Sequence, residues 1–110
     1  MKESNISKLI EIEASKYGCI TLRLNSGKFY QGTLQNATLT NLRHIKGCPE
    51  GTSDLLIIVP NGKIIFCETK TTTGKQRESQ KIFQLAIEKL GHIYILARCP
   101  EDIRKVLTNV

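Results

Sequence analysis

Two short apolar runs, 55–59 and 63–68, flank Pro60-Asn61-Gly62 near the middle of this 110-residue chain. Each run is rich in β-branched and aromatic residues and has the length of a strand. Pro60 suits the first position of a turn, Asn61 the second, and Gly62 the left-handed position that completes a three-residue loop with a bulge. The sequence therefore predicts a β-hairpin whose register is set by its loop.

In this register Asp54 lies opposite Glu68, with the two Cβ atoms about 5 Å apart. Glu68 and Lys70 share one face of their strand because side chains alternate, and Thr69 points the other way. A two-residue loop would pair Asp54 with Thr69 instead. The spacing thus predicts that Asp54, Glu68 and Lys70 gather at one end of the hairpin.

Both faces of this hairpin are otherwise apolar. Strands that are apolar on two sides belong in a sheet that is covered on both sides, so the acidic pair should lie at the end of the sheet, where the core meets solvent. One face carries Leu55, Ile57, Val59, Ile65 and Cys67, and the other carries Leu56, Ile58, Ile64 and Phe66.

Two carboxylates so close repel each other unless they share a cation, and all-oxygen ligation suits Mg²⁺ or Mn²⁺. Such an ion would bind a scissile phosphate and lower the pKa of water, while Lys70 orients or deprotonates the nucleophile. A Glu-x-Lys pair by itself is common on solvent-facing strands. Here it ends an apolar run, meets Asp54 and precedes a basic segment, which favours a metal-dependent phosphodiester hydrolase.

Charge and composition indicate the partner and the compartment. The chain has 16 Lys and Arg against 10 Asp and Glu, a net charge of +6 that suits a polyanion. Its four cysteines are far apart and form no C-x-x-C pair, which disfavours zinc and iron–sulfur sites and favours reduced thiols. We see no secretory signal and no apolar run of membrane-spanning length. We expect a soluble cytoplasmic protein with no membrane partner.

The remaining elements predict one α/β domain over residues 1–110, with no repeat or linker. Residues 4–17 form an amphipathic helix, and either Glu3 or Glu13 could reach a site at the edge of the core. The order α-β-β-(β)-β-β-α-β-α indicates a mixed sheet flanked by helices. We expect strands at 19–24, 29–34, 39–46 and 92–97, a turn at 26–28, a helix at 76–90 and a last helix from 100.

Basic residues surround the predicted start of the helix at 76–90. Backbone amides at a helix start, together with Lys75, Arg77 and Lys81, could hold a phosphate. The alternative is an ordinary solvated helix start. A second basic group, Arg23, Arg43 and Lys46, lies in the middle of the chain.

Short motifs are spread over nearly the whole chain. They are Glu3, Arg23-x-Asn25-x-Gly27, Gly51-Thr52-Ser53-Asp54, Gly62, Phe66-x-Glu68-x-Lys70, Gly74-Lys75, Gln80, and Gly91 before an apolar strand. Together they resemble the VRR-NUC branch of the PD-(D/E)XK nucleases.

This resemblance implies a restriction-endonuclease-like core with a metal site made by Glu3, Asp54, Glu68 and the carbonyl of Cys67 or Thr69. It implies a catalytic Lys70 and a supporting Gln80. Small stand-alone members, of phage or bacterial type, resemble Holliday-junction resolvases, which act as symmetric dimers. The chain departs from the family pattern at Arg77, where a Ser or Thr cap is usual, and at Thr69, where Val is usual.

We therefore predict a DNA endonuclease dependent on Mg²⁺ or Mn²⁺, selective for branched DNA and homodimeric through its first helix or residues 29–42. One alternative is a non-catalytic nucleic-acid-binding module or a nuclease subunit that depends on a partner. A sequence-specific restriction enzyme would need a recognition insert, for which this chain is too short. The predicted catalytic residues are Asp54, Glu68, Lys70 and Gln80; the metal ligands Glu3, Asp54, Glu68 and Thr69; and the nucleic-acid contacts Arg23, Asn25, Arg43, Lys46, Lys75, Arg77 and Lys81.

Overall fold

The computed structural model describes residues 1–24, 28–35 and 38–110, and for 28–35 and 38–46 we consider the backbone alone. The elements are α1 (Glu3–Ser15), β1 (Ile20–Arg23), β2 (Lys28–Gln35), β3 (Thr38–Lys46), β4 (Leu55–Ile58), β5 (Ile64–Thr69), α2 (Glu78–Lys89), β6 (Ile93–Ala97) and α3 (Pro100–Leu107). Their order confirms the predicted one. The turn expected at 26–28 falls largely outside the described residues.

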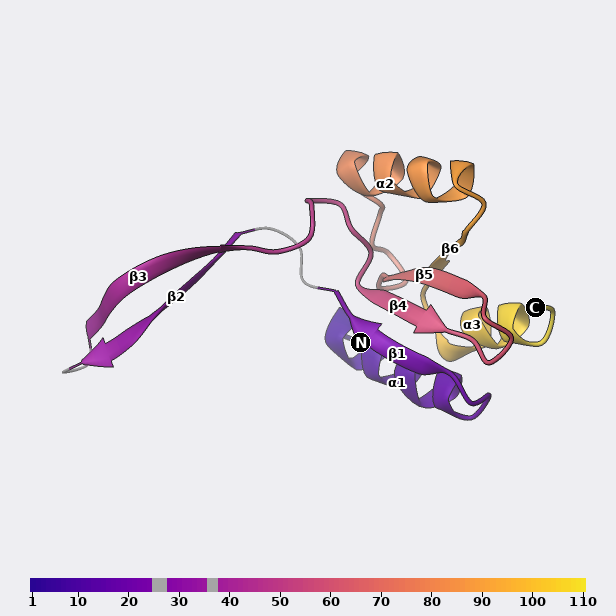
Figure 1. Ribbon diagram of the computed structural model, residues 1–110. Coiled ribbons are helices and arrows are strands. Elements are labelled where there is room, and N and C mark those ends of the chain that lie inside the picture. The colour runs from indigo at the N-terminus through magenta and orange to yellow at the C-terminus, as the bar shows by residue number, and fades with distance from the viewer. Residues whose placement is uncertain (25–27, 36–37) are drawn as a thin grey trace.

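Four strands form a mixed sheet in the order β1-β4-β5-β6. The pairs β1–β4 and β4–β5 are antiparallel, and β5–β6 is parallel with α2 as the crossover. β2 and β3 form a separate antiparallel pair that extends away from the four-stranded sheet (Figure 1). The predicted α/β class with a mixed sheet and flanking helices is therefore confirmed.

The β4–β5 hairpin has the register that its loop predicts. Leu56 pairs with Phe66, and the Val59 N–H donates to the Lys63 carbonyl oxygen at 2.9 Å. Gly62 has a φ of 88°, the left-handed conformation that the three-residue loop requires. As a result the chain just before β4 arrives beside the last residues of β5.

The helices cover the two faces of the sheet unequally. α1 and α3 pack on one face and on each other, and bury the face of β4 and β5 that carries Leu55 and Cys67 (Figure 1). α2 lies over the other face near β5 and β6, because one helix of about 10 Å diameter covers about two strands spaced 4.8 Å apart. The expectation that both faces are covered is therefore wrong for β1 and the outer part of β4. Ile20, Leu22 and Ile58 stay 62%, 47% and 36% exposed.

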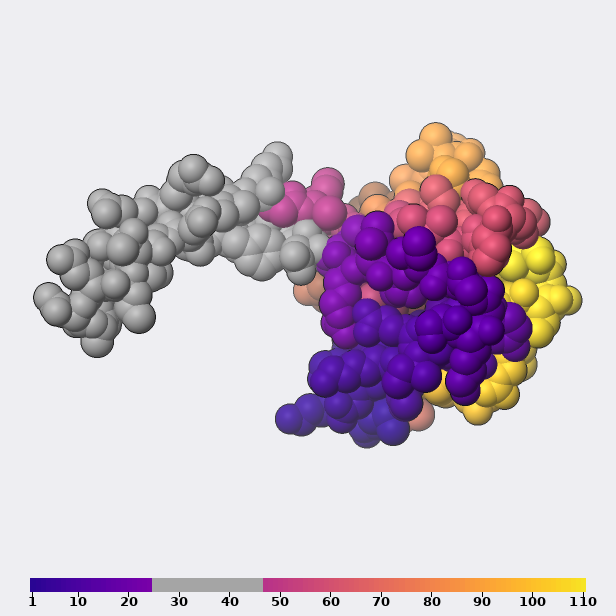
Figure 2. Space-filling view, turned by 60° about the horizontal axis from the view of Figure 1, so that its bottom comes forward, coloured from indigo at the N-terminus to yellow at the C-terminus, as the bar shows by residue number. Residues whose placement is uncertain are grey.

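The N-terminal elements α1 and β1 contact each other, and β1 is an edge strand of the four-stranded sheet. α1 and β1 are side by side on one face of the body (Figure 2), and Ile6, Ile10 and Ala14 of α1 are buried as their spacing predicts. All four cysteines are free. No helix in the described part of the chain is long and apolar enough to cross a membrane.

Candidate metal centre

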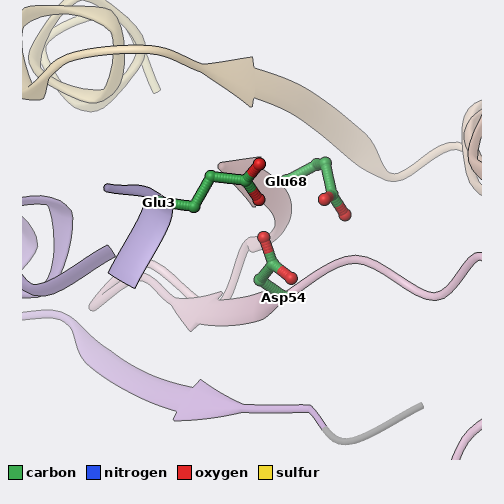
Figure 3. A group of neighbouring side chains, drawn as sticks. All are labelled: Glu3, Asp54 and Glu68. Atoms are coloured by element: carbon green, nitrogen blue, oxygen red, sulfur yellow. The ribbon is translucent and has the colours of Figure 1, made fainter. Parts of the chain in front are cut away.

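Three carboxylates from distant parts of the chain meet at the end of the β4–β5 hairpin. Glu3 opens α1, Asp54 precedes β4 and Glu68 lies in β5, and one oxygen atom from each lies within 4.8 Å of the others (Figure 3). Glu68 is 2% exposed, Asp54 is partly buried and Glu3 is exposed. The cluster thus runs from the interior to solvent, and a pocket of about 230 Å³ opens beside Glu3 and Asp54.

Asp54 is fixed by the strand that carries Glu68. Asp54 Oδ2 accepts hydrogen bonds from the Thr69 N–H at 2.9 Å and from the Thr69 hydroxyl at 2.7 Å. The Asp54 carbonyl oxygen accepts one from the Leu24 N–H at 2.8 Å. The motifs in the sequence predicted a role only for the carbonyl of Thr69, and the contact made by its side chain was not predicted. The fixed register, which brings Asp54 to the end of β5, was the signal that could have revealed it.

Gly51 explains why the segment before Asp54 lies against α2. It is buried with a φ of 91°, and a Cβ atom at this position would overlap the carbonyl oxygen of Ser79 in the first turn of α2. Only a glycine allows so close an approach. The segment 51–53 therefore joins Asp54 to the same helix that carries Gln80.

Glu68 is a buried carboxylate with few compensating contacts. Its Oε2 accepts a hydrogen bond from Gln80 Nε2 at 3.1 Å and lies 4.0 Å from Lys70 Nζ. Among the residues that the structure describes, Glu68 Oε1 has no hydrogen-bond partner. Burial raises the pKa of Glu68 to about 8, the negative charge of Asp54 adds to the rise, and Lys70 opposes it.

This arrangement fits a divalent cation. A buried polar atom without a partner is unfavourable, and a cation would satisfy Glu68 Oε1 while relieving repulsion among the three carboxylates. The donors are all oxygens, and such sites suit hard ions such as Mg²⁺ or Mn²⁺. Glu3, Asp54 and Glu68 could therefore hold a metal ion.

Gln80 connects this cluster to the start of α2. Its Oε1 accepts a hydrogen bond from the N–H of Arg77, the residue before the helix, at 2.8 Å, and its Nε2 donates to Glu68. Gln80 thereby satisfies the N–H of Arg77 in the way that the Glu or Gln of a capping box does. These two hydrogen bonds fix the orientation of the Gln80 amide group and of the Glu68 carboxyl group.

Lys70 and Arg98 each follow the end of one strand of the parallel pair. The Lys70 N–H donates to the Ala97 carbonyl oxygen at 3.0 Å. Arg98 Nη1 donates to the carbonyl oxygens of Thr71 at 2.5 Å and Gly74 at 2.7 Å, which holds the loop after Lys70. Arg98 was not predicted from the sequence, because only the parallel pairing of β5 with β6 brings the ends of these two strands to the same edge.

Glu13, the other acidic residue considered for this site, lies elsewhere. It is 5% exposed and forms ion pairs with Arg104 at 3.2 Å and Lys16 at 3.5 Å. The hydrogen bond from Arg104 lowers the pKa of Glu13. Of the two candidates in the N-terminal helix, the geometry brings Glu3 to the carboxylate cluster.

The predicted nucleic-acid contacts fall into two groups. Arg23 lines the pocket beside the cluster and pairs with Glu11, with Nε and Oε1 3.1 Å apart. Lys75, Arg77 and Lys81 are exposed around the start of α2. Asn25 lies outside the described residues, and Arg43 and Lys46 belong to β3, for which we consider the backbone alone.

Comparison with known proteins supports the fold. A solved structure titled "VRR_NUC domain" superposes on this chain with a TM-score of 0.67, covering 96% of this chain and 94% of that one, at 19% sequence identity. No protein-family model matches the sequence, and no curated protein does. The chain therefore has the fold of a VRR_NUC domain, and the resemblance drawn from its motifs is confirmed at the level of the fold.

Proposed function

We propose that this protein is a nuclease that hydrolyses phosphodiester bonds in DNA with bound Mg²⁺ or Mn²⁺. One observation carries the proposal. The buried Glu68 has an oxygen without a partner in the described part of the chain, and it faces two further carboxylates with Lys70 4.0 Å away. An acidic cluster with an adjacent buried ammonium group is suited to binding a cation and a phosphate together.

The residues take separate roles in this proposal. Glu3, Asp54 and Glu68 hold the ion, with the Thr69 carbonyl as a further oxygen ligand, and the bound ion supplies Lewis acidity and a water of lowered pKa. Lys70 stabilises the negative charge that develops on the phosphate and orients the attacking water. Gln80 keeps Glu68 in the orientation that ligation requires.

The basic residues hold the DNA backbone. The proposed phosphate contacts are Arg23, Asn25, Arg43, Lys46, Lys75, Arg77 and Lys81, within a chain of net charge +6. Neutralising one of the exposed cations around α2, as in Lys75→Gln, should reduce the slope of log affinity against log salt by about 1. Lys105→Gln, at an exposed position of α3, is the matched control and should leave the slope unchanged. An equal change in both variants would show that α2 has no special part in binding.

We extend the proposal to branched DNA and to a homodimer, in the cytoplasm of a bacterial cell or a phage-infected host. Symmetric branched DNA has two equivalent scissile strands, and the described residues of one chain contain one acidic cluster. Paired cuts therefore need two protomers related by a two-fold axis. The predicted interface is α1, where Leu9 and Ile12 are 37% and 55% exposed, or the stretch 29–42.

Cleavage assays on linear, flap and four-way DNAs test the activity. We expect cleavage with Mg²⁺ or Mn²⁺, none with EDTA, and none for Asp54→Asn, which should still bind DNA because the basic surface is intact. Unchanged turnover in Asp54→Asn would overturn the proposed centre. Binding without cleavage under every condition would support the non-catalytic alternative.

Light scattering over a range of concentrations tests the assembly separately. We expect the mass of a dimer. A strictly monomeric protein that still cuts flaps would refute the resolvase-like part of the proposal and leave the chemistry of the acidic cluster standing.

A further inference from the structure

The β2–β3 hairpin is rooted directly beside the acidic cluster. It is inserted in the chain between Leu24 and Asp54, and these two residues are joined by a hydrogen bond in which the Leu24 N–H donates to the Asp54 carbonyl oxygen at 2.8 Å. Leu24 and Asp54 both line the pocket beside the cluster. From there the hairpin extends away from the four-stranded sheet (Figure 1).

The charge of this region is of one sign. No Asp or Glu occurs between Glu13 and Glu50. The register of the hairpin pairs Lys28 with Lys46 near its root and Gln31 with Arg43 further out. Like charges directly opposite each other destabilise a pair of strands, so an anionic partner would stabilise the hairpin root.

Among the described residues, β2 and β3 pair with each other and with no strand of the four-stranded sheet. Such a pair of strands is marginally stable in water unless it packs against something else. A second copy of this chain would bring an equally cationic hairpin, which disfavours pairing between identical arms. A polyanion supplies both the missing partner and the opposite charge.

We propose that the β2–β3 hairpin is an arm that binds the backbone of duplex DNA flanking the site of cleavage. The inference rests on the proposed function, and it specifies the substrate as DNA with a sufficiently long duplex on the arm's side of the acidic cluster. The strands have 8 and 9 residues. At about 3.3 Å per residue the arm spans roughly 26–30 Å, which is about 8 base pairs of duplex at 3.4 Å each.

Binding measurements without divalent metal test the arm independently of cleavage. The probes are two DNAs that differ only on the arm's side of the fork. One has a long duplex flank of about 16 base pairs, which exceeds the estimated span, and in the other, the short flank, the duplex ends at the fork and offers the arm no phosphates. The variant Arg43→Gln/Lys46→Gln is compared with Lys89→Gln/Lys105→Gln, which removes the same charge from α2 and α3. Fluorescence anisotropy over a salt series gives the affinity and its salt slope, and circular dichroism verifies folding.

On the long flank we expect the arm variant to reduce the magnitude of the salt slope by about 1.8, or 0.9 for each lost phosphate contact. On the short flank its slope should equal that of the unaltered protein, and the control variant should match the unaltered protein on both. An unchanged slope on the long flank would refute DNA binding by the hairpin. An equal reduction on both flanks would refute the proposal that the hairpin contacts the flanking duplex.

Two further outcomes separate this inference from other readings. If the arm variant loses half of its mass in light scattering, the hairpin binds a second copy of the chain, and the proposal is wrong. If the arm variant has a reduced salt slope but the protein cleaves no DNA, the arm is supported and the proposed nuclease activity is refuted. If the protein cleaves DNA but the arm variant has an unchanged slope, the nuclease activity is supported and the arm is refuted.

Discussion

Glu13 and Glu68 are both glutamates with almost fully buried side chains, exposed by 5% and 2%, yet their surroundings are opposite. Glu13 is paired with Arg104 and Lys16, and the Arg104 hydrogen bond lowers its pKa. Glu68 lies beside Asp54, and burial together with that neighbouring charge raises its pKa to about 8. The fold therefore favours the anionic form of Glu13 and disfavours the anionic form of Glu68.

The difference shows two ways in which a fold can accommodate a buried acidic group. At Glu13 the cations of Arg104 and Lys16 neutralise the carboxylate when the chain folds, so that no ligand is needed there. Glu68 has an oxygen without a partner in the described part of the chain, and a cation from outside could complete the site there.

The largest expected effect comes from making the same substitution at both positions. Glu68→Gln should abolish cleavage, because it removes a proposed metal ligand. Glu13→Gln should keep the turnover number and lower the thermal unfolding midpoint, because Arg104 loses its partner. Cleavage assays and thermal unfolding of the two variants, without added metal in the unfolding experiment, measure both effects. A cleavage defect in Glu13→Gln equal to that of Glu68→Gln would remove the distinction between the two sites.

Metal affinity should depend on pH. With a pKa of about 8, the Glu68 carboxyl is mostly protonated at pH 7 before an ion binds, so binding must release a proton. Apparent affinity for Mg²⁺ or Mn²⁺ should therefore rise about tenfold per pH unit up to about pH 8 and then level off. Isothermal titration calorimetry in buffers of different ionisation enthalpy measures the affinity and the proton count. Affinity independent of pH between 6 and 8 would contradict a raised pKa.

The metal-free protein should lose stability over the same range. The pKa of Glu68 is raised from 4.5 to about 8, so the folded state binds more protons than the unfolded state between these values. The free energy of unfolding should therefore fall as pH rises through this window, by up to roughly 1.4 kcal/mol per unit. Glu68→Gln should remove this part of the slope. Urea unfolding at several pH values tests it, and a wild-type slope in Glu68→Gln would assign the dependence to other groups.

A smaller effect is expected at Gln80, which positions Glu68 and does not itself bind the ion. Gln80→Met keeps the size of the side chain and removes both of its hydrogen bonds, at a cost of about 1–2 kcal/mol in the free energy of unfolding. Metal affinity should fall, and added metal should restore part of the cleavage rate. Gln84→Met, one turn further along α2, is the matched control. Full activity of Gln80→Met at limiting metal would show that Glu68 needs no such support.

The smallest effect is expected at Arg98, which holds the loop after Lys70 through two carbonyl oxygens. Arg98→Lys keeps the charge and loses the double contact, worth about 1 kcal/mol or roughly a fivefold change. Because this loop leads to Lys75, we expect a higher KM for DNA with little change in kcat. Arg104→Lys, which disturbs the Glu13 pair instead, should leave KM unchanged. A lower kcat with constant KM would place Arg98 closer to the chemistry.

The parts of this protein that depend on short-range rules could be predicted from the order of its residues. The loop residues 60–62 set the β4–β5 register, and the register brought Asp54 to the end of β5. The alternation of side chains along β5 then placed Glu68 and Lys70 on one face, and Glu68 Oε2 lies 4.0 Å from Lys70 Nζ. Turn geometry and side-chain alternation act over a few residues, so they can be derived without knowing the rest of the fold.

The tertiary structure alone decided the contacts between elements far apart in the chain. It selected Glu3 over Glu13 for the cluster, because Glu13 is held by Arg104, which lies 91 residues away in sequence. It brought Arg98 to the loop after Lys70 through the parallel pairing of β5 and β6. It also left half of one sheet face uncovered. Helical periodicity and local turns constrain which residues can face a core, and only the packing of whole elements decides which partner each of them meets.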